Sequence, residues 1–226
     1  MALDSAFFAP VTAKSRPEMI AERLRAAIAR GELASGNQLA EADLAQAFGV
    51  SRGPLREAMA RLVAEGLLVT HPHKGLFVVV HSDADVADIY AMRTAIENLA
   101  AKLLLSRDVD KAVRRLKLAC EQMRSALQAG DYAAMSDADH LFHAVLVEES
   151  GSPRLIRSAQ TLLVETRMCL GRLESKYEWP MEAVDEHVDI AEAIASRSPE
   201  AIEAAITEHM ERAAHLLTTG APVLHT

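Results

Sequence analysis

Aromatic residues are scarce in this chain, at 4% Phe, Trp and Tyr, whereas Leu, Ala, Glu and Arg dominate. That balance favours helices over sheets. Cysteine is also scarce: Cys120 and Cys169 lie far apart without CxxC spacing, which predicts two buried thiols in a reducing compartment. No apolar run approaches the roughly 20 residues of a membrane span, and no basic region precedes Phe7 and Phe8 as a signal peptide requires. We therefore expect a mainly α-helical cytoplasmic protein.

Acidic residues are concentrated in the C-terminal part of the chain. The net charge is −8 over 226 residues, but residues 1–81 contain nine Lys and Arg against eight Asp and Glu, while residues 82–226 contain fifteen against 24. A near-neutral segment is free to approach a phosphate backbone, which the acidic remainder would repel. Half of the residues are hydrophobic, which is enough for two small cores. We predict two domains, residues 1–81 and residues 82–226.

Three helices and a hairpin are predicted in the N-terminal domain. Apolar residues at helical spacing predict helices over Pro17–Arg30 and Glu41–Phe48. A third helix begins after Ser51, which can cap it by accepting a hydrogen bond from the Gly53 N–H. The buried stripe of this third helix is formed by Leu55, Ala58, Met59, Leu62 and Val63. The segments "LLVT" and "LFVVV", separated by "HPHKG", predict two short strands. This order is that of a winged helix-turn-helix.

Two arginines lie on the outer face of the third helix, near its N-terminus. Arg52 and Arg56 project away from the apolar stripe. Arginine can bind guanine O6 and N7 with both arms in the major groove of DNA. The hairpin tip, His73 and Lys74, is suited to phosphate or minor-groove contact. Two alternatives stay open: Arg52 can be simply solvated, and Arg56 can pair with a neighbouring acid.

The run "IARGELASGNQLAEADLAQAFGVSRGPLREAMARLVAEGLLVTHPHKGLFV" resembles the N-terminal DNA-binding domain of the GntR family of bacterial transcription regulators. The resemblance implies that Ser51, Arg52 and Arg56 contact the operator. Gly53 replaces the small hydroxyl residue that the family usually has between this arginine and the proline, which leaves the fine specificity open. The predicted DNA-binding set is Ser51, Arg52, Gly53, Arg56, His73 and Lys74.

The C-terminal domain is predicted to be an antiparallel bundle of six helices. Short loops punctuated by Gly and Pro separate segments of helical apolar periodicity. These segments are Asp83–Ser106, Asp110–Ala129, Tyr132–Glu149, Pro153–Lys176, Met181–Ser196 and Pro199–Thr218. Binding sites in such bundles form from inward side chains on facing helices.

Four residues of this bundle are candidate metal ligands. The segment "DHLFH" places Asp139 and His143 four apart on one helical face, and His187 and His209 lie on two further helices. A carboxylate and three imidazoles can form a mixed nitrogen and oxygen site for a divalent metal, with one or two coordination positions open. The alternative for the Asp139–His143 pair alone is an exposed or hydrogen-bonded pair. His140 points about 100° away from Asp139, and we expect it at the surface.

All four candidate ligands match the pattern of the FCD ligand-sensing domain, which the C-terminal part resembles and which follows many GntR-type DNA-binding domains. That resemblance implies that the four residues bind the metal: zinc, with nickel or manganese as alternatives. The segment "YAMRTAIENLAAKL" fits the Arg-x-x-x-Glu pattern of that domain with Arg93 and Glu97. An arginine at this position often faces the effector pocket, whereas the alternative is an ion pair with Glu97 on the surface.

These features together predict a homodimeric transcription regulator: a repressor that its ligand releases from DNA, with an activator as the alternative. The winged domains would read an inverted-repeat DNA operator, because two-fold protein symmetry is mirrored in the site. A small organic acid would bind the open metal positions through its carboxylate, with Arg93 as a second anchor. Two rivals use the same Asp/His₃ site. One is a metalloenzyme that activates water, although no general base is evident by motif. The other is a regulator for which the metal itself is the signal.

Overall fold

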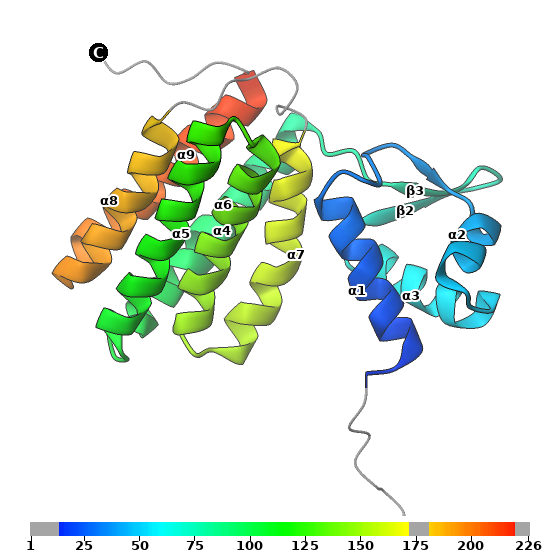
Figure 1. Cartoon of the computed structure of the whole chain (residues 1–226), viewed down its shortest axis with the longest axis horizontal. Coiled ribbons are helices and arrows are strands. Elements are labelled where there is room, and N and C mark those ends of the chain that lie inside the picture. The colour runs from blue at the N-terminus through cyan, green and yellow to red at the C-terminus, as the bar shows by residue number, and fades with distance from the viewer. Residues whose placement is uncertain (1–13, 172–180, 220–226) are drawn as a thin grey trace, which may run out of the picture.

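The computed structural model describes residues 14–171 and 181–219, and within these residues the fold is mainly α-helical, as predicted. Two parts lie side by side in Figure 1. The first, here named the winged unit, consists of α1 (Arg16–Ala29), β1 (Gln38–Leu39), α2 (Glu41–Phe48), α3 (Arg52–Ala64), β2 (Leu68–His71) and β3 (Gly75–Val78). The second, here named the helical bundle, consists of α4 (Asp83–Leu104), α5 (Val109–Ala129), α6 (Tyr132–Glu149), α7 (Pro153–Leu170), α8 (Glu182–Ser196) and α9 (Pro199–Thr219).

Local sequence signals explain where α1 and α2 begin and end. Ser15 and Glu18 form a capping box at the start of α1, because each side chain bonds the backbone of the other residue. Helix α2 ends at Gly49, whose φ of 62° is the left-handed conformation that glycine adopts without steric cost. The resulting tight turn sets the direction of α3, which carries the predicted DNA-facing arginines.

Helix α3 differs from the prediction in two details. Ser51 occupies the N-cap position, but its side chain makes no capping hydrogen bond. The third helical residue is Pro54, which has no N–H, so one of the two usual donors to a capping hydroxyl is missing. The buried stripe is also narrower than predicted, since Val63 is 38% exposed. The remaining four stripe residues are buried as expected: Leu55, Ala58, Met59 and Leu62.

Among the described residues, the wing has three strands rather than two. The order is β1-β3-β2 with antiparallel pairing throughout, so the predicted hairpin is present and β1 adds to the free edge of β3. Gln38 pairs with Phe77, and its side-chain Nε2 donates to the Lys74 carbonyl oxygen at 2.6 Å. A two-residue strand has too little pattern to be recognised in the sequence, because its register depends on the strand that it joins.

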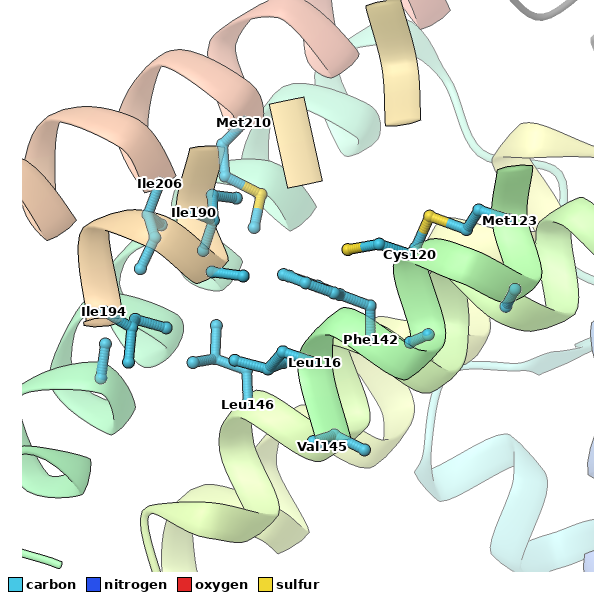
Figure 2. Close-up of a cluster of buried hydrophobic side chains, with 14 of the residues drawn as sticks. Leu116, Cys120, Met123, Phe142, Val145, Leu146, Ile190, Ile194, Ile206 and Met210 are labelled. Atoms are coloured by element: carbon cyan, nitrogen blue, oxygen red, sulfur yellow. The ribbon is translucent and has the colours of Figure 1, made fainter. Parts of the chain in front are cut away.

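The helical bundle has one large core to which α5, α6, α8 and α9 contribute, and Figure 2 shows Phe142 of α6 within it. Phe142 is fully buried, and Leu146 lies one turn further along the same helix. The predicted segments agree with the helices, and Tyr132–Glu149 agrees to the residue. The predicted end of the fourth segment, Lys176, lies outside the described residues. None of the described helices is both long and apolar enough to span a membrane.

Helix α7 belongs to two cores. Its residues Val164 and Met168 are buried in the hydrophobic cluster of the winged unit, together with Leu24 and Ile28 of α1. Other α7 residues pack against α4 and α6 inside the helical bundle. In Figure 1, α7 (yellow) lies next to α1 (blue) at the junction of the two parts. The winged unit is thus attached to the bundle through apolar packing on α7 as well as through the chain that enters α4.

Candidate metal centre and nucleic-acid interface

Three of the four predicted metal ligands come together inside the helical bundle. His143 lies on α6, His187 on α8 and His209 on α9. One ring nitrogen of each lies within 4.8 Å of the others, and all three side chains are buried. The Nε2 atoms of His143 and His187 are 3.3 Å apart. Two ligand atoms on one zinc ion at bond lengths of about 2.0–2.1 Å are separated by about 3 Å, so this spacing fits a shared metal.

The opposite nitrogen of each ring is held by a second group. His143 Nδ1 lies 2.7 Å from Glu97 Oε2, and His209 Nδ1 lies 2.9 Å from Glu186 Oε2. His187 Nδ1 lies 2.6 Å from the Ala183 carbonyl oxygen, one turn back on α8. Such partners fix both ring orientation and tautomer, and they leave Nε2 of each histidine for the centre. This is the arrangement found around histidines that ligate metals.

Asp139 supplies a carboxylate oxygen at the edge of the three-histidine group. Its Oδ1 lies 3.2 Å from His187 Nε2 and 3.9 Å from His143 Nε2. Its side chain is 14% exposed, whereas those of the two histidines are almost completely buried. Phe142 packs edge-on against both of these rings and closes one side of the group. Asp139 therefore adds a carboxylate oxygen close to two of the three histidines, and Phe142 forms an apolar wall beside them.

Burial and charge determine the protonation of this cluster. Burial lowers the pKa of His143 well below its usual value, and the nearby Arg93 charge lowers it further. Burial and the charge of His187 likewise lower the pKa of His209. For Asp139, burial favours the neutral acid, but the hydrogen bond from His187 and the neighbouring imidazoles outweigh it and lower the pKa. For His187, burial favours the neutral ring, but the hydrogen bond and the charge of Asp139 outweigh it and raise the pKa. A metal ion binds neutral imidazole and ionised carboxylate, so metal binding would displace a proton from His187.

Arg93, the predicted effector anchor, is buried beside the cluster rather than exposed. Its Nε donates to Glu97 Oε1 at 2.9 Å, so the ion pair that the spacing allowed is present, but inside the bundle and not at the surface. Nη2 lies 2.9 Å from the same oxygen without the alignment of a hydrogen bond, which leaves a buried donor unused. Nη1 lies 3.4 Å from the Thr166 hydroxyl of α7, and the guanidinium carbon is 5.2 Å from the centre of the Tyr90 ring.

His140 does not lie at the surface as predicted. It is half-buried where α6 faces α7, and its Nδ1 has no hydrogen-bond partner among the described residues. Burial lowers its pKa, and the charge of Arg167 on α7 lowers it further. The prediction was wrong because the roughly 100° between consecutive helical residues shows only that His140 points away from Asp139. It does not show that α7 covers the face of α6 on which His140 lies.

The predicted DNA-binding residues of α3 are all exposed. Ser51, Arg52, Gly53 and Arg56 lie at or just before the first turns of the helix, opposite its buried stripe. Arg52 makes no ion pair with any residue that the structure describes. Arg56 Nε donates to Glu41 Oε2 at 2.8 Å, so the alternative of a neighbouring acid holds for this arginine.

The wing tip also presents its predicted residues to solvent. His73 and Lys74 are exposed, and His73 has a φ of 61°, a conformation that non-glycine residues seldom adopt outside tight turns. The Lys74 N–H donates to the His71 carbonyl oxygen at 3.1 Å and closes the turn. Together with the Gln38 bond to the Lys74 carbonyl oxygen, this geometry holds the tip at one end of the sheet.

Sequence reasoning missed the groups that orient the cluster. Glu97 was recognised only as a partner of Arg93, yet it also bonds His143, which lies 46 residues further along the chain. Glu186 bonds both His209 and Arg212 on α9. An acidic residue on the inner face of a bundle helix is the one available signal, because acids are rarely buried without a partner. Which histidine each acid meets depends on helix packing.

Comparison with known proteins finds two family matches in this chain. Residues 17–78 match the family of "Bacterial regulatory proteins, gntR family", and residues 88–212 match the FCD domain family. A "Probable D-xylose utilization operon transcriptional repressor" of Paenarthrobacter nicotinovorans is 30% identical over 193 residues, or 85% of this chain and 83% of that protein. The gluconate operon transcriptional repressor of Bacillus subtilis (strain 168) is 27% identical over 183 residues, or 79% and 75% of the two chains.

A solved structure agrees with the fold. The structure titled E. coli McbR/YncC superposes with a TM-score of 0.83 at 21% identity, covering 92% of this chain and 99% of that one. The FCD match alone covers more than half of the chain. The chain therefore belongs to the GntR family of DNA-binding transcriptional regulators, in the group that carries a C-terminal FCD domain.

Proposed function

We propose that this regulator is a repressor whose affinity for its operator is modulated by a small carboxylate bound at a metal ion in the helical bundle. The observation that carries the proposal is the convergence of three buried imidazoles whose outer nitrogens are each held by a separate group. The inner nitrogens of His143 and His187 lie 3.3 Å apart, a spacing at which both can bind one metal ion.

The proposed metal ligands are Asp139, His143, His187 and His209. Nitrogen donors with one carboxylate suit a divalent transition metal, and we propose zinc, with nickel and manganese as alternatives. A bound divalent ion would supply a Lewis-acidic centre to which a carboxylate can coordinate. The chain's own contribution is the fixed orientation of its rings by Glu97, the Ala183 carbonyl and Glu186, together with the apolar wall at Phe142.

A carboxylate is the effector class that suits the residues around the cluster. The unused Nη2 donor of Arg93 lies within the same hydrogen-bonded group as His143, because both side chains bond Glu97. Arginine and a metal ion together can bind two ends of a small acid. Of the two repressors compared above, one is named for gluconate, which is itself a hydroxy acid. We assign Arg93 as the second anchor of such an acid.

Operator binding is assigned to the winged unit and falls within residues 1–81, while sensing is assigned to residues 82–226. Arg52 and Arg56 are proposed to read base edges, with Ser51, Gly53, His73 and Lys74 approaching the backbone or adjacent bases. The exposure of all six residues supports this assignment. The helical bundle is acidic, and its carboxylates are repelled by the DNA phosphates, so we expect it to stay away from the duplex.

A homodimer is proposed because one face of α4 is apolar and exposed. Met92, Leu99 and Leu103 are 49%, 48% and 42% exposed, and their spacing places them along one side of the helix. Apolar side chains aligned in this way are typical of a helix that packs against a partner. A two-fold pair of such helices would set two winged units side by side, as an inverted-repeat operator requires.

Helix α7 is the proposed route from the sensor to the DNA-binding part. Thr166 contacts Arg93 on the side of the metal cluster, whereas Val164 and Met168 of the same helix are buried in the core of the winged unit. A ligand changes operator affinity only if it binds one arrangement of the two parts more tightly than another. A ligand that displaces Arg93 would act on α7 and therefore on the position of the winged unit.

The test is to measure operator affinity while Zn²⁺ is titrated, with and without a panel of small mono- and dicarboxylic hydroxy acids. We expect Zn²⁺ alone to leave operator affinity nearly unchanged and one acid to weaken binding about tenfold in its presence. Release by Zn²⁺ alone would support a metal sensor instead, and turnover of the acid would support a metalloenzyme. Absence of any effect of the acids, with Zn²⁺ bound, would contradict the proposal.

A further inference from the structure

Arg56 forms an ion pair with Glu41 across the helix-turn-helix. Glu41 is the first residue of α2, and Arg56 lies one turn into α3, so the pair spans the two helices of the helix-turn-helix. The bond joins Arg56 Nε to Glu41 Oε2 at 2.8 Å. Both side chains remain accessible, at 62% exposed for Arg56 and 37% for Glu41. The pair therefore lies on the surface that the proposed function assigns to DNA.

The geometry of the bond leaves the reading edge of the guanidinium unoccupied. Arginine has five N–H donors in a planar fork, and only the Nε donor is used here. Glu41 is the one hydrogen-bond partner of the Arg56 side chain among the described residues, so Nη1 and Nη2 stay available. These two nitrogens can bind guanine O6 and N7 end-on, with both arms at once. Glu41 and a guanine can then bind the same guanidinium on different edges.

The two DNA-facing arginines differ in this respect. Arg52 makes no ion pair within the described ranges, so no carboxylate there orients its side chain. A long side chain that is already fixed loses less conformational freedom when it binds, and the lost freedom is a main cost of recognition. The carboxylate of Glu41 also neutralises part of the Arg56 charge and weakens its attraction for phosphates of any sequence. Both effects favour discrimination between base pairs over affinity for DNA of any sequence.

We propose that Glu41 is a specificity-determining residue that positions Arg56 for one guanine of the operator. The inference rests on the proposed role of Arg56 in base reading. Glu41 itself contacts no base: it acts by orienting the guanidinium through Nε and by reducing sequence-independent attraction to the backbone.

The experiment uses the full chain and an operator selected by the wild-type protein from a random duplex library. Binding is measured at one fixed salt concentration to this operator, to its single-base-pair variants and to a scrambled duplex, because affinities depend steeply on salt. Arg56→Lys identifies the base pair that Arg56 reads, since lysine cannot form the two-armed contact. Glu41→Ala and Glu41→Gln test the positioning, and circular dichroism melting checks that each variant is folded.

We expect Glu41→Ala to reduce discrimination about tenfold at the same base pair that Arg56→Lys relaxes, and to raise affinity for scrambled DNA about twofold. Glu41→Gln should raise scrambled-DNA affinity similarly but keep most of the discrimination, because its amide oxygen still accepts from Nε. The matched control is Glu57→Ala, which removes the exposed partner of Arg61 further along α3 and should leave discrimination unchanged.

The role of Glu41 would be overturned if Glu41→Ala discriminated between base pairs as well as wild type does. It would also be overturned if the loss of discrimination were spread evenly over all base pairs of the operator. If Arg56→Lys weakens the base preference at one position of the operator and Glu41→Ala does not, only the positioning inference fails. If Arg56→Lys leaves every base pair unaffected, Arg56 is not a reader, and both the inference and that part of the proposed function fall.

Discussion

Glu165 on α7 is a half-buried acid at the junction of the two parts of the protein. Its Oε1 lies 3.7 Å from the position that a Cβ on Gly66 would take, in the turn between α3 and β2. Burial raises the pKa of Glu165 to about 7, and the negative charges of Asp85 and Asp88 on α4 raise it in the same direction. Glu165→Gln keeps the size of the side chain and mimics the protonated acid, so it removes this electrostatic cost.

The sign and size of the effect follow from the pKa. The folded protein holds the Glu165 proton more tightly than the unfolded chain, whose carboxyl has the ordinary value of 4.5. The corresponding stabilisation is therefore complete below pH 4.5 and is lost as the pH rises to about 7. At 1.36 kcal/mol per pKa unit the ceiling is about 3 kcal/mol. Solvent screening at a half-buried site reduces the expected effect to about 1 kcal/mol.

The assay is urea unfolding, followed by circular dichroism, of wild type and Glu165→Gln at pH 5 and pH 8. We expect the free energy of unfolding of the variant to match wild type at about pH 5 and to exceed it by about 1 kcal/mol at pH 8. Glu121→Gln, at an exposed position on α5, is the control and should show the same difference at both pH values. An equal difference at both pH values for Glu165→Gln would refute the reasoning.

Two further predictions concern DNA binding and its regulation. Arg52→Ala should weaken operator binding about tenfold at matched salt and relax base preference, which an unchanged footprint would contradict. Thr166→Val keeps the shape of the side chain but removes the oxygen near Arg93 Nη1, so we expect it to leave operator affinity without effector intact and to reduce the effect of the carboxylate several-fold. The effect of the acid is measured as the ratio of operator dissociation constants with and without it. A wild-type ratio for Thr166→Val would show that Thr166 does not couple effector binding to DNA binding.

Local signals in the sequence were sufficient for most of the fold. The helices follow from apolar periodicity and from caps that act within a few residues, such as the capping box of Ser15 and Glu18 and the left-handed Gly49. The strand β1 was missed because two residues carry no period, and its pairing with β3 is a long-range contact. The exposure of Val63 was missed because the stripe predicts which face is buried but not how wide the covering elements are.

For the candidate site, the sequence indicated residue types better than it indicated their surroundings. His143, His187 and His209 could be grouped by their place on three helices, and the structure brings them together. The burial of the Arg93–Glu97 pair and the covered position of His140 could not be predicted, because both depend on how α4, α6 and α7 pack. The sequence predicted that Arg56 could pair with a neighbouring acid but did not identify Glu41. The two residues are fifteen positions apart and lie on different helices, so their contact depends on the turn between α2 and α3.

The most direct measurement is calorimetric titration of Zn²⁺ into the metal-free full chain, comparing wild type with His187→Ala. We expect one ion per chain for wild type, and at least tenfold weaker binding for the variant with an unchanged circular dichroism spectrum, because one of the three converging imidazoles is lost. Zn²⁺ binding of equal affinity and stoichiometry in His187→Ala would mean that the buried histidines of α6, α8 and α9 do not hold a metal ion together.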